Sequence, residues 1–179
     1  EPGTSYTYRV GDRSLNLWSG DGTFRTDDGD SKFSFISIAD VQASSDENFA
    51  HAAETMHGAV KTLPNYEFMI NLGDLSNPNT KSNTNWVNGV YYSFDYGNAH
   101  FAVINTNDMY PMTQSQRNWL VNDMSKTDAD WKIVLMHRAS YSEGKNINKP
   151  DAIIMRDVLI PLFDELDIDV VEAGHDHVY

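Results

Sequence analysis

The stretch Asp169-Val-Val-Glu-Ala-Gly-His-Asp-His177 joins a short apolar run to two histidines that are one residue apart. The run predicts a buried strand over 169–173, because adjacent valines favour extended backbone and a glycine ends the run. Alternate positions past a strand end point to the same side, so two histidines there are rarely coincidental. We therefore interpret His175 and His177 as candidate metal ligands.

Three earlier apolar runs end in the same way, in Asp40, Asp74 and His137. The carboxyl ends of neighbouring strands in an α/β sheet converge on one crevice, so these side chains are expected to meet the two histidines. A mixture of carboxylate and imidazole suits Zn, Mn or Fe better than Ca or Mg. Glycine precedes both Asp74 and His175, which predicts a sharp turn of the backbone as each strand ends.

Each of these residues also has a structural explanation. Asp74 could serve as a turn residue or a helix cap, and a lone histidine such as His137 is more often part of a core. The four strand ends together favour a metal site, mononuclear or binuclear. The remaining histidines, His51, His57 and His100, are expected to have structural or surface roles, because their positions do not place them on a shared face.

The surrounding pattern alternates strands with helices from residue 32 onward, which predicts an α/β fold. The expected strands cover 33–38, 68–72, 91–96, 100–105, 132–136 and 169–173, and the expected helices cover 45–63, 113–125 and 151–166. Pro161 is expected to kink or divide the last helix.

The first thirty residues have a different texture. Tyr6-Thr-Tyr-Arg-Val10, Ser14-Leu-Asn-Leu-Trp18 and Phe24-Arg-Thr26 predict short strands separated by turns. Asp27-Asp-Gly-Asp30 then predicts a solvated turn that links them to the rest of the chain. We expect 1–29 to be a separate β unit with its linker.

The composition excludes several classes of function. The 179 residues include 26 acidic and 13 basic side chains and have a net charge of −13, so a stable nucleic-acid partner is not expected. No apolar run reaches the roughly 18 residues of a membrane span, so no membrane partner is expected either. The chain has no cysteine, which removes disulfides, thiol catalysis and cysteine-type zinc sites.

Four short blocks resemble signature blocks of the calcineurin-like metallophosphoesterases, and of the purple acid phosphatase-like enzymes of bacterial type in particular. The blocks are Ile38-Ala-Asp-Val-Gln42, Asn71-Leu-Gly-Asp74, Val134-Leu-Met-His137 and Gly174-His-Asp-His177. The resemblance implies an α/β (α+β) two-sheet sandwich flanked by helices, over residues 30–179. It also implies that residues 1–29 are the C-terminal part of a fibronectin-like β-sandwich.

The resemblance implies two divalent or trivalent metal ions, drawn from Fe, Mn and Zn. Asp74 would bridge them, Asp40 and His177 would complete one site, and His137 and His175 would serve the other. A hydroxide between the metals would then attack phosphorus, which makes Asp74, His137 and His175 the implied catalytic residues. The implied substrate is a small phosphate mono- or diester, and the implied location is extracellular or at the cell surface.

The sequence departs from the family pattern at two single positions and in one block. Asn77 stands where the purple enzymes carry a tyrosine, and Gln42 stands where other members carry a histidine ligand. The Gly-Asn-His-Glu/Asp block expected between Asp74 and Tyr91 is also absent. We therefore expect a truncated catalytic domain with an internal gap near 75–80.

These departures leave two further interpretations beside the hydrolase. One alternative is a catalytically impaired remnant that binds metal or phosphate without turnover. The other is a surface or scaffold domain whose acidic face mediates contacts, an interpretation that requires Asp74→Asn to leave metal binding unchanged.

Overall fold

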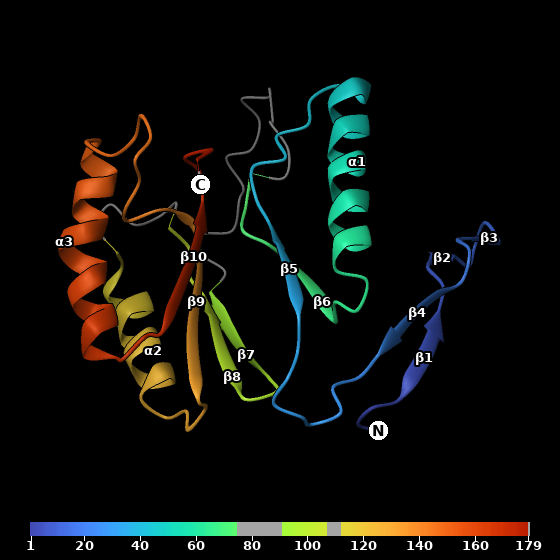
Figure 1. Ribbon diagram of the computed structural model, residues 1–179, viewed down its shortest axis with the longest axis horizontal. Coiled ribbons are helices and arrows are strands. Elements are labelled where there is room, and N and C mark those ends of the chain that lie inside the picture. The colour runs from blue at the N-terminus through green and yellow to red at the C-terminus, as the bar shows by residue number, and fades with distance from the viewer. Residues whose placement is uncertain (75–90, 107–111, 179) are drawn as a thin grey trace.

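The computed structural model describes residues 1–74, 91–106 and 112–178. Within these ranges the chain forms a layered mixed α/β fold (Figure 1). A larger and a smaller β-sheet lie in the middle, helices α2 and α3 lie on one side of the larger sheet, and α1 lies beyond the smaller one. The predicted two-sheet sandwich flanked by helices is confirmed.

The larger sheet has the strand order β10-β9-β8-β7. Its strands are β7 (Tyr92–Tyr96), β8 (Ala99–Val103), β9 (Trp131–Arg138) and β10 (Val170–Gly174). Strands β8, β9 and β10 run parallel, whereas β7 pairs antiparallel with β8 across a tight turn, as the hairpin pattern predicts. Parallel pairing brings the carboxyl ends of β8, β9 and β10 to one edge.

The smaller sheet pairs β5 (Phe35–Ile38) with β6 (Phe68–Asn71) in parallel. The chain leaves β5 for α1 (Asp46–Thr62), whose Ser45 cap accepts a hydrogen bond from the Asn48 amide. None of the α1 side chains is buried. Because β5 and β6 run parallel, their carboxyl ends lie together at one end of the smaller sheet.

Helices α2 (Gln114–Met124) and α3 (Pro150–Glu165) pack on the larger sheet. Pro161 lies inside α3, and the predicted division of this helix is wrong. Pro161 and Asp157, whose carbonyl loses its usual helical donor there, are both exposed, so water can satisfy that carbonyl without a break in the helix. Among the described helices, none combines the length and the apolar character that a membrane crossing requires.

Two hydrophobic clusters hold the layers together. One joins the larger sheet to α2 and α3 and includes Val134, Leu120 and Leu159, all at most 1% exposed. The other fills the space between the sheets around Phe101, which is 0% exposed and meets Phe35, Phe68 and Phe94 at ring-centroid distances of 4.8–5.8 Å. Burial of these rings is the main contribution to the packing of one sheet on the other.

A cavity of about 790 Å³ lies between the sheets, along the edge of β6 that pairs with no other strand in the described ranges. Its walls come from β6 and from the facing side chains of β7, β8 and β9, and they are mainly apolar. His137 and Gly73 lie in the same lining. The described part of the smaller sheet therefore leaves some of the interior between the sheets open.

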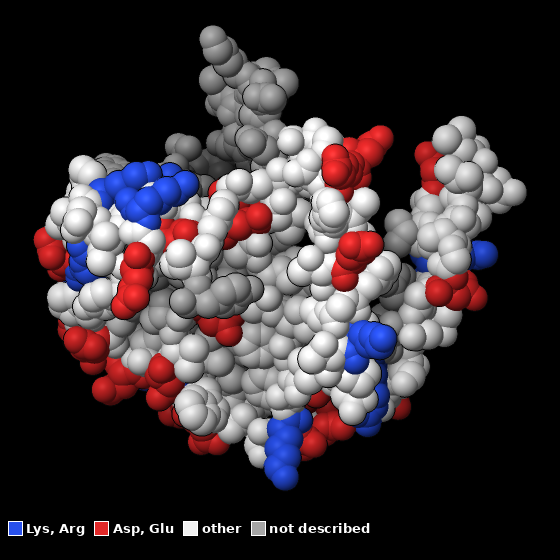
Figure 2. Space-filling view, turned by 45° about the horizontal axis from the view of Figure 1, so that its top comes forward, with Lys and Arg blue, Asp and Glu red and all other residues white. Residues whose placement is uncertain are grey.

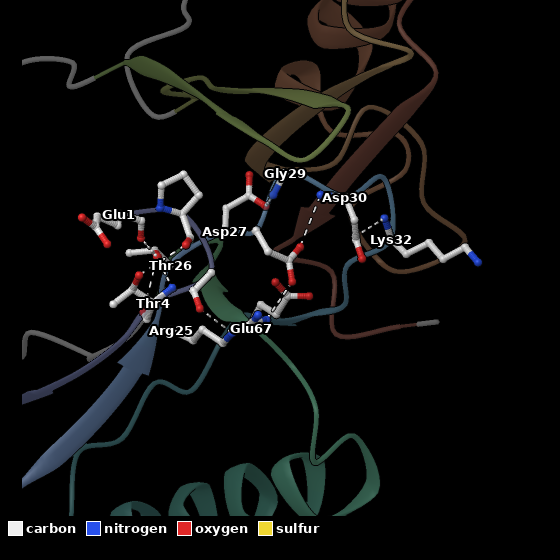
Figure 3. A network of polar contacts seen from close by, with 12 residues as sticks. Glu1, Thr4, Arg25, Thr26, Asp27, Gly29, Asp30, Lys32 and Glu67 are labelled. Atoms are coloured by element: carbon white, nitrogen blue, oxygen red, sulfur yellow. Dashed lines mark hydrogen bonds and ion pairs between the residues drawn. The ribbon is translucent and has the colours of Figure 1, made fainter.

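The N-terminal segment forms short strands, as the alternating pattern predicts. Strand β1 (Ser5–Tyr8) pairs antiparallel with β4 (Gly22–Arg25), and β2 (Gly11–Asp12) pairs with β3 (Leu17–Trp18). Figure 3 shows the polar network at the base of this unit, where Thr26 accepts a hydrogen bond from the Thr4 amide.

The linker makes turns through its own carboxylates. Asp27 accepts from the Gly29 amide at 2.9 Å and Asp30 from the Lys32 amide at 2.7 Å (Figure 3). The second oxygen of Asp27 accepts from the Gly97 amide at 3.2 Å. The segment is thus a turn tied to the β7–β8 hairpin rather than a cation-binding loop.

His100 lies on the helix-covered face of the larger sheet, with a side chain only 9% exposed. Its Nδ1 lies 2.6 Å from Asp95 Oδ1 on β7, and its Nε2 lies 2.9 Å from Asp123 Oδ2 on α2. Burial alone would lower the pKa of His100, but the two carboxylates outweigh it and raise the pKa above the ordinary value. The structural role expected for His100 therefore takes the form of a charged clamp between the sheet and α2.

This clamp predicts a pH-dependent stability. Because the folded pKa is raised, the contribution of His100 is complete below its unfolded pKa and is lost as the pH rises through the folded value. Replacing His100 with Gln should lower the midpoint of thermal unfolding by about 2–4 °C more at pH 5.5 than at pH 8.5. Circular dichroism at both pH values measures the difference, and His51→Gln, at a side chain 72% exposed, is the control. An equal fall at both pH values would contradict the clamp.

Candidate metal centre

The five candidate ligands all lie at or just past the carboxyl ends of parallel strands. Asp40 follows β5, Asp74 follows β6, His137 lies near the end of β9, and His175 and His177 follow β10. The carboxyl ends of β9 and β10 lie at the top in Figure 1, near the C-terminus. The structure brings these residues together in two groups.

The first group consists of Asp74, His137 and His175. One ligand atom from each lies within 4.8 Å of the others, a spacing that suits a single metal ion. His137 Nε2 lies 3.2 Å from Asp74 Oδ2, and the two imidazole rings meet edge to face with centroids 5.1 Å apart. A carboxylate and two imidazoles form a three-ligand set of the kind that catalytic zinc and non-haem iron sites use.

The hydrogen bonding of His137 supports this interpretation. Its Nδ1 lies 3.1 Å from the Leu72 carbonyl oxygen, which can only accept, so Nδ1 carries the proton. The lone pair of Nε2 then faces the carboxylate of Asp74 at 3.2 Å. Two acceptors at this distance repel unless a proton or a metal ion lies between them, so this pair of atoms can hold a metal ion in place of a proton.

The second group consists of Asp40 and His177. His177 Nε2 lies 3.3 Å from Asp40 Oδ1, on a carboxylate whose side chain is 11% exposed. Apart from this contact with His177, Oδ1 is buried and accepts no hydrogen bond from the described residues, whereas Oδ2 accepts from the His175 amide at 2.7 Å. A buried carboxylate oxygen without a donor is costly, and a cation would satisfy it.

The backbone at the site is strained. Asp40, Gln42, Asp74, His175 and His177 all have a positive φ, between 44° and 74°, and they are five of the seven non-glycine residues in the described chain that do. Asp and His tolerate this region better than most residues, yet each such residue costs energy. Clustering of this strain at one place is typical of functional sites.

The two glycines allow close approaches that a side chain would block. Gly73 has a φ of +119°, and a Cβ there would lie 2.7 Å from His137 Nδ1. A Cβ on Gly174 would lie 2.5 Å from Asp40 Oδ2. The φ of Gly174 is not positive, so this glycine is required by the nearness of Asp40 rather than by the turn that the sequence predicted.

Replacing Gly174 with Ala is expected to push Asp40 away from the His175 amide. The overpacking and the lost hydrogen bond should lower the free energy of unfolding by about 1–3 kcal/mol. Urea unfolding measures this loss. Gly58→Ala on α1 is a matched control, because a Cβ at Gly58 would meet nothing within 4 Å and the change should stabilise by roughly 0.5–1 kcal/mol. A Gly174→Ala variant as stable as the wild type would contradict the close contact.

The electrostatics keep His175 ready to bind a cation. Burial lowers the pKa of His175, and the positive charge of Arg138 lowers it further. A neutral imidazole is the form that binds metal.

Acidic side chains are spread over the face shown in Figure 2, whereas the basic ones form small separate groups.

Three residues near the site were not among the predicted ligands. Gln42 donates through Nε2 to Asp74 Oδ2 at 2.9 Å. Asp176 is 7% exposed and accepts a hydrogen bond from Asn146, which comes from the loop after β9. Asp176 stands between two candidate ligands, but nothing in the sequence pairs it with Asn146, which is thirty residues earlier.

The predictions that concern Asn77, the gap near 75–80 and the missing block lie outside the described residues. His51 and His57 lie exposed on α1, in agreement with the surface roles expected for them.

Comparisons with known proteins agree with the fold and identify the family. The sequence profile described as "Calcineurin-like phosphoesterase" matches residues 80–179, more than half of the chain. Purple acid phosphatase 21 of Arabidopsis thaliana is 34% identical over 93 residues, which are 50% of this chain and 21% of that protein. A purple acid phosphatase of Glycine max is 34% identical over 92 residues, which are 50% of this chain and 20% of that protein.

A solved structure shares the fold. The purple acid phosphatase PPD1 from yellow lupin (Lupinus luteus) seeds superposes with a TM-score of 0.74 at 17% sequence identity, over 98% of this chain and 44% of that one. The matched part of the chain spans about a fifth of the length of these curated relatives.

Proposed function

The chain belongs to the calcineurin-like phosphoesterase family and is purple acid phosphatase-like, and on this premise we propose that it hydrolyses phosphate mono- or diesters with bound metal ions. The observation that carries the proposal is the convergence of Asp74, His137 and His175 within 4.8 Å at the strand ends. Their ligand types suit Fe, Mn or Zn.

Two ions are proposed. Asp74, His137 and His175 would hold one, and Asp40 and His177 would hold the other, with Asp74 shared. When bound, the ions would supply Lewis acidity that polarises the phosphate and lowers the pKa of water, so that hydroxide is available to attack phosphorus near neutral pH. The family relationship and the buried Asp40 Oδ1, which has only the 3.3 Å contact with His177 among the described residues, support the second ion.

Residues of the chain position the proposed ligands. The Leu72 carbonyl fixes the tautomer of His137, so that the lone pair of Nε2 faces Asp74. The His175 amide holds Asp40, and this bond ties the end of β5 to the end of β10. Asp74 is 39% exposed at its side chain, which leaves room for a small phosphate ester beside it.

The domain organisation is part of the proposal. Residues 1–29 are proposed as the C-terminal part of a fibronectin-like β domain with its linker, and residues 30–179 as the catalytic domain. The exposed antiparallel pair β1–β4 and the turn-forming linker support this division. We also propose an extracellular or cell-surface location and no stable nucleic-acid partner, in keeping with the net charge of −13.

Turnover of p-nitrophenyl phosphate and of its bis-ester tests the activity, each with added Mn, Zn or Fe. We expect hydrolysis with at least one ion and none after chelation, and the ratio of the two rates assigns mono- or diesterase activity. No turnover with any ion, in a protein that is folded, would sink the proposal. Metal uptake without turnover would favour the non-catalytic binding protein instead.

A further inference from the structure

The turns that follow β5 and β6 continue to pair after the strands have ended. The Asp40 amide donates to the Gly73 carbonyl at 3.0 Å, and the Gln42 amide donates to the Asp74 carbonyl at 2.8 Å. Asp40, Gln42 and Asp74 all have a positive φ, so the two turns stabilise each other in a conformation that neither favours alone. Gln42 is therefore held beside Asp74 by its backbone.

The Gln42 side chain adds a second bond to the same residue. Its Nε2 donates to Asp74 Oδ2 at 2.9 Å, which is the oxygen nearest to His137 Nε2. This bond limits rotation of the carboxylate about its own side-chain axis. The amide nitrogen has no lone pair to offer a cation, so in this orientation it supports a ligand without acting as one.

The two groups of ligands are consequently unequal. Asp74, His137 and His175 already lie within 4.8 Å of one another, with His137 fixed by Leu72. Asp40 and His177 pair with each other, and one Asp40 oxygen is occupied by the His175 amide. His177 is also 49% exposed at its side chain, so ordering it on an ion costs more conformational freedom.

We propose that Gln42 is a positioning residue that orients Asp74 for one ion at Asp74, His137 and His175, so that this ion binds first and the ion at Asp40 and His177 binds more weakly. The inference rests on the proposed function only in taking these residues as metal ligands. A supporting hydrogen bond of this kind typically contributes about 10–100-fold to metal affinity.

Titration of the chelator-treated protein with Mn²⁺ alone, followed by calorimetry, tests the order of binding. We expect two classes of site whose dissociation constants differ by at least about 10-fold. His137→Ala should remove the tighter class, and His177→Ala should remove the weaker class and leave the tighter one. Two equal classes, or loss of the tighter class in His177→Ala, would overturn the inference.

The role of Gln42 itself is tested by Gln42→Met, which keeps the length of the side chain and removes the donor. The tighter class should weaken about 10–100-fold, and the weaker class should weaken less, because the oxygen that Gln42 holds, Oδ2, is the one that faces His137. Gln114→Met on α2 is a matched control, because the Gln114 side chain bonds only to Asn118 among the described residues. A tighter class unchanged in Gln42→Met, or both classes weakened equally, would overturn the positioning role.

These outcomes separate the inference from the proposed function, because the titration contains no substrate. Ordered binding without hydrolysis would sink the phosphoesterase and support the inference. Hydrolysis by a protein with two equal sites would support the phosphoesterase and overturn the inference.

Discussion

Asp74→Asn is expected to lower the rate of phosphate-ester hydrolysis at least about 100-fold and to weaken metal binding with it. The change keeps the shape of the side chain and removes the negative charge that faces His137 Nε2 at 3.2 Å. It also replaces the acceptor of the Gln42 amide with a group that can turn a donor toward it. Loss of charge at the shared ligand should therefore affect both ions.

The measurements are the turnover of p-nitrophenyl phosphate and the Mn²⁺ content after dialysis. Asp128→Asn is the matched control, because Asp128 is exposed and away from the site. Metal content and turnover that stay at wild-type levels in Asp74→Asn would contradict the site and would favour a scaffold role. Reduced turnover in both variants would point to a general effect of charge instead.

Phe101→Ala is expected to cost about 3–5 kcal/mol of stability, the largest loss predicted for a single side chain. Phe101 is 0% exposed and contacts rings from both sheets, among them Phe35 on β5 and Phe94 on β7. Its removal leaves a cavity beside the one that already lies between the sheets. Because a cavity already lies there, fewer side chains are close enough to move into the space that Phe101 leaves.

Urea unfolding followed by circular dichroism measures this loss. Phe49→Ala, at a side chain that is 55% exposed on α1, is the control and should change stability by less than about 1 kcal/mol. A similar small change in Phe101→Ala would contradict the placement of the core between the sheets.

The fold could be predicted because its signals are local. The alternating apolar runs located the strands from β5 to β10, and Ser45 and Thr113 marked the starts of α1 and α2. Pro161 did not divide α3, because the cost of a proline in a helix depends on whether water reaches the freed carbonyl, and that depends on the packing of α3.

The candidate ligands could also be located, because each ends a strand and parallel strands share an edge. Their grouping could not be derived from the residues alone. The bond from Gln42 to Asp74 joins residues 32 positions apart, and the bond from the His175 amide to Asp40 joins residues 135 positions apart. Such pairings depend on how the two sheets pack, which no local pattern encodes.

His100 illustrates the same limit. Its strand position was predictable, but its two carboxylates come from β7 and α2, so its charge depends on the docking of a helix. For Gly174 the sequence predicted a sharp turn of the backbone. The structure shows a different requirement for glycine, which is the close approach of the Asp40 carboxylate.

The most direct test of the metal-dependent site is the rate of p-nitrophenyl phosphate hydrolysis as Mn²⁺ is returned to the chelator-treated protein. We predict that the rate is negligible without the ion and rises with its binding. His57→Ala, at an exposed histidine of α1, should behave as the wild type does, whereas His137→Ala should stay inactive. A rate that survives chelation, or one that His137→Ala retains, would contradict a centre built on Asp74, His137 and His175.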